Sequence, residues 1–307
     1  MIVKIKRITT LIIISAILCM FTLATLDAIA LEVYGYNNGK SYRGCSESFS
    51  DLAKIGDNPE YKQVYKQLKN METTILPEGI TVEEMKRYMR YAQLKDTDLG
   101  YIYCYEAHER NGMIAKMYLS EEKKKAIIEK NSKAKEVLDS IKIDNRSEYS
   151  IAKSVYTELT SRISYGCLDM KNDDKSSPYS MPAYNRKGIY SIVIGEGDCQ
   201  GMLKCYKYLC DKYGVNCEVV WDKEGKHMWD VVKIDNRWYN VDMTSGSVYE
   251  PMFCVNDDDY RRIMGYVSAF DDIKCTSRAP IEEIFVYPTK HLKRIRERTD
   301  WNTFEID

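Results

Sequence analysis

The sequence predicts a protein of the α+β class, in which a helix that begins at a cysteine packs on an antiparallel sheet and a mainly helical region precedes them. Apolar residues recur at helical spacing from Ile151 to Ile163 and again from Met202 to Tyr213. Strand-like runs then follow one another up to Asp242, separated by short polar turns that favour antiparallel pairing.

The composition is that of a globular protein. The chain has 307 residues, of which 44% are apolar and 30% are charged, so it is long enough to bury a full core. Its formal net charge of −1 gives no indication of nucleic-acid binding. We therefore expect no nucleic-acid partner.

The first 30 residues are typical of a secretory signal. Lys4, Lys6 and Arg7 form a basic start, residues 11–26 carry no charge, and Ala28-Ile29-Ala30 is a small-x-small site. We expect cleavage after Ala30 and a secreted or cell-surface protein. The alternative is an uncleaved membrane anchor formed by residues 11–26, although this run is shorter than the ~20 residues that span a bilayer. Either way, membrane contact is expected only through this segment.

Residues 31–119 are expected to form a helical and hairpin region. A helix is predicted over residues 58–71, and a second over 81–92 with a capping box between Thr81 and Glu84. Two strands, 101–105 and 113–119, are predicted to form a hairpin around Asn111-Gly112.

Two longer helices are expected next, followed by a loop. Ser120 begins a charged helix running to about Ile141, and Ser147 begins the helix that contains Ile151 to Ile163. Residues 167–188 contain Pro178 and Pro182 and predict an irregular loop. Such a loop either lines a cleft or simply connects elements at the surface.

Cys199 is predicted to stand at a helix N-terminus. Two glycines, Gly197 and Gly201, flank it, and the helical pattern that follows closes at Gly214. The unsatisfied N–H groups and the positive end of the helix dipole favour an anion there, so they favour the thiolate. The same N–H groups can stabilise a tetrahedral oxyanion.

The strands predicted after this helix bring a histidine and an aspartate together if the loop between them has two residues. A strand over 217–221 is followed by runs at 227–234 and 237–242, joined by Asp235-Asn236, two residues that tolerate positive φ. A two-residue loop would pair His227 with Thr244 and place Asp242 diagonally beside His227 on the same face. A three-residue loop would turn His227 and Asp242 to opposite faces.

These residues indicate nucleophilic catalysis. Cys199 would be the nucleophile, His227 its base, and Asp242 the group that orients the imidazole. The chain has only three histidines, and the other two are His108 and His291. Each residue also has a structural explanation, as core thiol, satisfied strand histidine or turn former. Their order and spacing favour the catalytic interpretation.

The other cysteines are expected to be structural. Of ten cysteines, setting aside Cys19 and Cys199 leaves eight, which permits up to four disulfides in an exported protein. Those eight are Cys45, Cys104, Cys167, Cys205, Cys210, Cys217, Cys254 and Cys275. For Cys205 and Cys210, which fall on the helical pattern, buried free thiols are favoured over disulfides.

Three motifs together resemble the transglutaminase-like superfamily. They are Gly-x-Cys-x-Gly at 197–201, His227-x-Trp229, and Trp-Tyr-x-Val-Asp at 238–242. The resemblance covers roughly residues 120–280 and implies a papain-like α+β core with a triad at Cys199, His227 and Asp242. The predicted organisation is a signal at 1–30, the N-terminal region at 31–119, a transglutaminase-like domain at 120–280 and a basic tail at 281–307.

Departures from the superfamily pattern concern the edge of the site. Relatives often have His-Ala-Trp-Asn where this chain has His227-Met228-Trp229-Asp230, and Ser245 stands in place of Trp. Met228, Trp229 and Ser245 are therefore the predicted cleft rim, which affects the choice of substrate. Tyr190 is the candidate second oxyanion donor.

The predicted activity is exported, cysteine-dependent acyl transfer or hydrolysis on peptide or glutamine amides, with a protein or peptide substrate, no cofactor and no metal. The superfamily includes cross-linkers, deamidases and proteases, so the acceptor stays open. A catalytically inert cell-surface binding module is the alternative. A papain-family peptidase proper is disfavoured, because its histidine lies roughly 130–150 residues after the cysteine, a much larger separation than that of Cys199 and His227.

Two charged segments have competing interpretations. The basic run at 290–298 predicts a solvated C-terminal helix or a contact with an anionic cell envelope. Asp257, Asp258 and Asp259 fit a helix N-terminus before Tyr260 better than a calcium loop, because they lack the spacing of oxygen ligands that calcium requires.

Overall fold

Helices and strands are mixed in the computed structural model, and its largest sheet is antiparallel, which is the α+β class expected. The structure describes residues 54–75, 82–104, 106–110, 113–166, 181–223, 227–244 and 252–278. The predicted signal at 1–30, the basic run at 290–298 and the predicted capping residue Thr81 lie outside these residues. The domain boundaries stay predictions.

The N-terminal region begins with two helices, α3 (Pro59–Lys69) and α4 (Val82–Lys95). Both lie close to their predicted positions. The Asn58 side chain caps α3 by accepting hydrogen bonds from the backbone N–H groups of Glu60 and Tyr61.

The strand predicted at 101–105 is wrong. The chain instead forms the 3₁₀ helix η1 (Thr97–Cys104). Tyr101 and Ile102 are adjacent yet both buried, which strand alternation on a one-sided sheet would not allow. The Tyr101 hydroxyl donates to the carbonyl of Leu68 at 2.9 Å, so packing against α3 overrides the β preference of these side chains.

The predicted hairpin is present, although its first strand begins later than expected. Strands β2 (Glu106–Arg110) and β3 (Met113–Tyr118) pair antiparallel, with Arg110 opposite Met113. A short strand, β1 (Thr74–Ile75), pairs with the other edge of β3, giving the order β1-β3-β2.

The two long helices are confirmed. Helix α5 (Glu121–Asp139) is capped by Ser120, and α6 (Glu148–Arg162) begins with a capping box in which Ser147 and Ser150 bond reciprocally.

The loop predicted over 167–188 is wrong at its end. Residues 181–187 form helix α7 (Met181–Lys187), which is followed by the one-turn helix α8 (Ser191–Ile194). Pro182 is the second residue of α7, a position where the missing N–H costs nothing. Strands β4 (Ser164–Tyr165) and β5 (Glu196–Gly197) then pair in parallel just before Cys199.

The main sheet has the order β6-β7-β8-β9 and is antiparallel throughout. Its strands are β6 (Asn216–Trp221), β7 (Met228–Ile234), β8 (Arg237–Asp242) and β9 (Met252–Val255). The predicted register is confirmed, because Ile234 pairs with Arg237 and Asp230 with Val241. The turn between them has positive φ at Asp235 (48°) and Asn236 (63°), as a tight hairpin requires.

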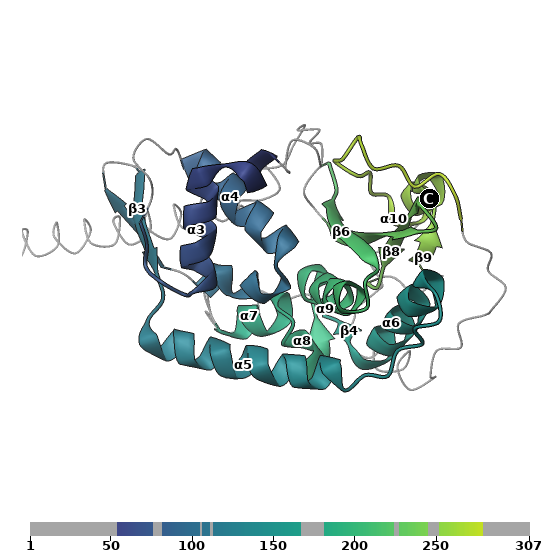
Figure 1. Cartoon of the computed structure of the whole chain (residues 1–307), viewed down its shortest axis with the longest axis horizontal. Helices are drawn as coiled ribbons and strands as arrows, with labels where there is room; N and C mark the ends of the chain where they lie inside the picture. Colours follow the sequence, from purple (N-terminus) through teal and green to yellow (C-terminus); the bar gives the residue numbers. More distant parts are fainter. Residues whose placement is uncertain are drawn as a thin grey trace, which may run out of the picture. The chain divides into compact units, whose positions relative to one another are not determined.

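Helix α9 (Cys199–Lys212) packs on this sheet and against α6 (Figure 1). Met202, Tyr206 and Leu209 are buried there with apolar residues of both neighbours, and Gly214, with φ of 79°, ends the helix as predicted. Helix α10 (Asp257–Met264) follows β9, and Asn256 caps it, so Asp257 to Asp259 do form a helix start.

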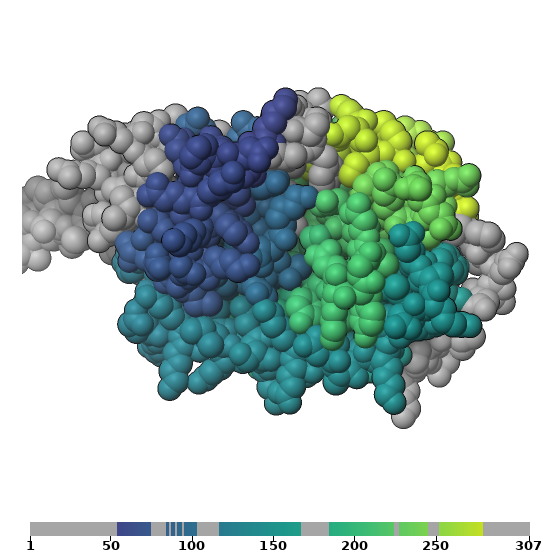
Figure 2. All heavy atoms as spheres, viewed as in Figure 1, coloured from purple at the N-terminus to yellow at the C-terminus, as the bar shows by residue number. Residues whose placement is uncertain are grey.

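Ion pairs join the N-terminal helices to the later part of the chain. Lys95 of α4 contacts Glu218 of β6 at 2.8 Å, and Asp98 of η1 contacts Lys135 of α5 at 2.6 Å. Figure 2 shows these segments in surface contact, with the teal atoms of α5 adjoining the blue atoms of the N-terminal helices. None of the helices in the described segments has both the length and the apolarity needed to cross a bilayer.

Candidate active site

Cys199 is the first residue of α9, as the sequence predicts. The Asp198 side chain caps the helix by accepting from the N–H groups of Gln200 (2.9 Å) and Gly201 (3.1 Å). Those two groups are therefore not open to a ligand, contrary to the expectation that the N–H groups of the first turn are generally available. The N–H of Cys199 itself has no acceptor among the described residues.

Gly201 is required by a close approach of two backbone segments. A Cβ atom at this position would lie 1.9 Å from the carbonyl oxygen of Arg186, at the end of α7. No side chain fits there, so the second glycine of the Gly-x-Cys-x-Gly pattern allows α7 to lie against the start of α9. The glycine pattern therefore contributes to the position of Cys199 by allowing α7 to pack closely on the start of α9.

His227 lies immediately before β7, between Asp242 and Cys199. Its Nε2 is 2.8 Å from Oδ2 of Asp242, and Cys199 is close enough to the ring to help raise the pKa of His227. Because Nε2 faces the carboxylate, Nδ1 is the ring nitrogen left for the sulfur. His227 and Asp242 thus lie in contact, and Cys199 lies near the ring.

The charges of this group depend on one another. Burial alone would lower the pKa of His227, but the Asp242 carboxylate and the hydrogen bonds to Asp242 and Cys199 raise it well above its usual value. Burial would raise the pKa of Asp242, yet His227 and hydrogen bonds from Thr244 and Tyr260 lower it overall. The arrangement therefore favours an imidazolium beside an ionised carboxylate.

Asp242 receives two further partners that the sequence did not predict. Thr244 donates from its N–H (2.9 Å) and its hydroxyl (2.6 Å) to Oδ1, and the Tyr260 hydroxyl donates to Oδ2 at 2.8 Å. The register argument places Thr244 opposite His227 and could have identified it. Tyr260 comes from α10, and no local pattern indicates which way its side chain points.

Aromatic rings enclose the imidazole. Tyr266 stacks on His227 with centroids 4.7 Å apart, and Trp229 lies 6.0 Å away on a nearly parallel plane. Trp229 is only 1% exposed, so it lies within the core rather than at the rim predicted for it. Met228 is half-buried, and Ser245 lies outside the described residues.

Tyr190 packs against other residues of the structure. It is half-buried against the apolar core, and the Lys130 ammonium lies 4.1 Å from its ring centroid. Its assignment as an oxyanion donor stays a prediction.

Six cysteines are free thiols, so the predicted option of disulfides does not apply to these six. Five besides Cys199 are buried, namely Cys205, Cys210, Cys217, Cys254 and Cys275. The preference for buried free thiols at Cys205 and Cys210 is confirmed. No group of three or more metal-ligating side chains occurs within the segments that the structure describes.

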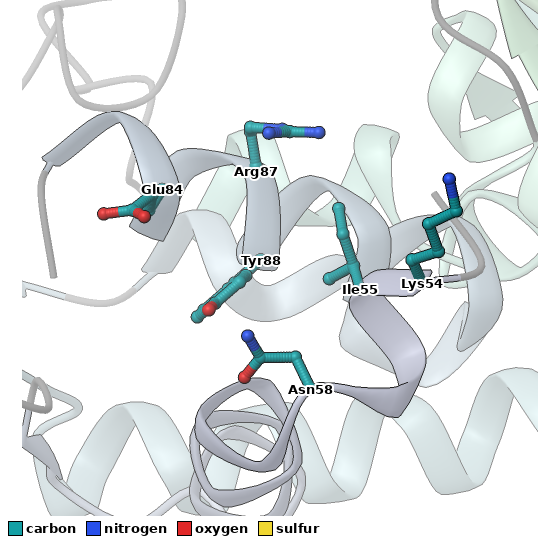
Figure 3. A pocket seen from close by; sticks show the side chains of 6 residues that line it. All are labelled: Lys54, Ile55, Asn58, Glu84, Arg87 and Tyr88. Atoms are coloured by element: carbon teal, nitrogen blue, oxygen red, sulfur yellow. The ribbon is translucent and has the colours of Figure 1, made fainter. Parts of the chain in front are cut away.

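Two pockets lie away from the sulfur. One of about 410 Å³ lies between the start of α3 and α4 and is lined by Lys54, Ile55, Asn58, Glu84, Arg87 and Tyr88 (Figure 3). Its charged side chains are mostly exposed, and it shares no residue with the cysteine site. The other, of about 120 Å³, includes Trp229, Tyr260 and Tyr266 in its lining, so it lies behind the imidazole.

Comparisons with known proteins give little support beyond the sequence. No family model matches the chain, and no curated protein matches it. A solved structure described as a crystal structure of a TGase is similar over 46% of this chain and 43% of its own, with 17% identity and a TM-score of 0.28. The similarity thus spans less than half of that protein, and its low score carries no argument about fold or activity.

Proposed function

We propose that this protein is an exported cysteine-dependent acyltransferase or hydrolase that acts on peptide or glutamine amides, with a transglutaminase-like, papain-like core. The observation that carries the proposal is the position of His227, whose ring is hydrogen-bonded to Asp242 and lies close enough to Cys199 for that side chain to help raise its pKa. The three motifs and the start of α9 at Cys199 also support it.

The first half of the reaction forms a thioester. The Cys199 thiolate attacks the carbonyl carbon of the amide, and the N–H of Cys199 donates to the developing oxyanion. The C–N bond then breaks as the His227 imidazolium gives its proton to the leaving nitrogen. Asp242 holds the ring in place and stabilises its charged form.

The second half releases the acyl group. Water or a primary amine attacks the thioester carbon and gives its proton to His227, and the C–S bond breaks to restore the thiolate. Water yields hydrolysis or deamidation, and an amine yields transamidation. Each reaction needs only the three side chains and the substrate, so the proposal involves no cofactor.

The start of the chain supports export, since residues 1–30 have the basic, apolar and small-residue pattern of a signal. An anchor formed by residues 11–26 is the alternative. The substrate would then be a protein or peptide outside the cell or at its envelope.

The test is mass spectrometry of glutamine-containing peptides incubated with wild type or Cys199→Ala, with and without a primary amine. Peptide cleavage, deamidation and amine incorporation give different mass changes. The proposal predicts at least one of them with wild type and none with Cys199→Ala. Alkylation of Cys199 at neutral pH that is lost in His227→Ala supports the enzyme, whereas an inert Cys199 in the folded protein favours a binding module.

A further inference from the structure

The Asp242 carboxylate is held at both oxygens. Thr244 donates twice to Oδ1, and Oδ2 accepts from both His227 and Tyr260 at 2.8 Å. An ionised carboxylate offers about four lone-pair directions, so these four bonds can engage all of them. Oδ2 is the oxygen that faces the imidazole. Tyr260 is its second partner and helps to fix the orientation of the carboxylate group.

Tyr260 is itself fixed in place. Its side chain is 2% exposed and its ring stacks on Trp229 with centroids 4.6 Å apart. The indole Nε1 donates to Asn240 (2.9 Å), and the Asn240 amide donates to Asp257 in the first turn of α10 (3.0 Å). The phenol therefore reaches Asp242 from a helix that is hydrogen-bonded to strand β8.

The ionisation of Tyr260 suits a donor. Burial is the main cause that raises its pKa well above the usual value, and the nearby Asp242 charge adds to it. The phenol therefore keeps its proton at neutral pH, where Asp242 is ionised. A neutral hydroxyl beside a carboxylate can only donate to it, and bonds of this kind are short and strong.

We propose that Tyr260 is a positioning residue for the cysteine site, which holds Asp242 in the orientation that accepts the hydrogen bond from Nε2 of His227. This rests on the proposed function for its effect on catalysis. Its geometric part, the orientation of Asp242 toward the ring, does not depend on the substrate.

The variant Tyr260→Phe tests the proposal, because it keeps the ring that stacks on Trp229 and removes only the hydroxyl. We expect the rate of Cys199 alkylation by iodoacetamide at neutral pH to fall about 10-fold or more, the effect of losing a hydrogen bond to a charged group. The low-field proton resonance of the His227 Nε2–H should also move upfield, since its bond to Asp242 weakens.

Tyr206→Phe is the matched control. It removes another buried hydroxyl, one that donates to the backbone carbonyl of Ala152 at 3.2 Å. We expect the rate and the resonance of this variant to equal those of wild type. Thermal unfolding shows whether the two variants are folded. Alkylation rates and resonances are then compared at a temperature below the unfolding transitions of both variants.

The outcomes separate the two proposals. A Tyr260→Phe protein whose alkylation rate stays within about twofold of wild type, with the resonance unmoved, overturns the role of Tyr260 and leaves the proposed function standing. If Cys199 of wild type does not react, the proposed function fails, and the resonance alone still decides whether Tyr260 orients Asp242.

Discussion

The first turn of α9 and the core beneath it hold the same chemical group in two different settings. Cys199 is partly buried and lies near His227, whereas Cys205, on the same helix, is fully buried. Burial raises the pKa of the Cys205 thiol to about 12, and it also raises that of Cys254. From this difference we predict that position on the helix, and not the presence of a thiol, determines which cysteine reacts.

Two buried aspartates of the hairpin repeat this contrast. Asp242 contacts an imidazole and three donated hydroxyl or amide protons, and its pKa is lowered despite burial. Asp230 lies 3.5 Å from the Cys217 sulfur, and burial raises its pKa well above the usual value. The pKa of one carboxyl is therefore lowered and that of the other is raised, although the two lie on neighbouring strands.

The largest expected effect follows from this pair. Asp242→Asn should lower amide turnover by on the order of 10³- to 10⁴-fold, because the amide no longer stabilises the imidazolium or selects its tautomer. Asp230→Asn is the control, since it makes the same change at a buried aspartate of the neighbouring strand whose side chain contacts Cys217. Peptide mass spectrometry measures both rates, and equal losses in the two variants would contradict the contrast.

The second prediction concerns the thiols. Iodoacetamide at neutral pH should label Cys199 and leave the five buried thiols unmodified, because those need an opening of the core that slows labelling on the order of 10³-fold or more. Peptide mapping after a timed reaction measures each site. Labelling of Cys205 or Cys210 at a similar rate would mean that the core beneath α9 is accessible.

Much of this site could be predicted from the sequence because local rules determine it. Asp235 and Asn236 tolerate positive φ, and this fixes the hairpin register. Continued beyond the paired residues, that register sets Thr244 near His227, where Oγ1 lies 3.4 Å from Nε2. The helical repeat after Cys199 and the Gly214 stop likewise define α9. Neither feature needs information from distant parts of the chain.

The features that were wrong or missing depend on distant contacts. Tyr101 prefers a strand by propensity, but its hydroxyl and ring pack against α3 and form η1 instead. Trp229 follows the histidine closely, yet stacking on Tyr260 draws it into the core. The bond from Tyr260 to Asp242 joins α10 to β8, and only tertiary packing decides which side of α10 faces the site.

The third prediction is a pH dependence of stability. The raised pKa of His227 means that its pairing with Asp242 stabilises the fold fully below the unfolded-state value of about 6.5 and less as pH rises through the folded value. His227→Gln should therefore have a lower free energy of unfolding than wild type, and this difference should be largest at pH about 6 and shrink as pH rises. Between these limits the difference should shrink by about 1.4 kcal/mol for each unit by which the pKa of His227 is raised. Urea unfolding across pH 6 to 10 measures the difference, and a gap that grows with pH would contradict it.

The smallest effect is expected at the turn that sets the register. Asn236 has φ of 63°, where an alanine costs about 1 kcal/mol and a glycine does not. Asn236→Ala should therefore lower the free energy of unfolding by about 1 kcal/mol relative to Asn236→Gly, which urea unfolding measures. The N–H of Asp235 donates to Glu148 at 2.9 Å and helps to hold the turn in both variants. Because the register is kept, Cys199 alkylation should be unchanged in Asn236→Gly. A loss of alkylation in Asn236→Gly would show that the turn positions His227 relative to the Cys199 sulfur in a way that the strand register alone does not.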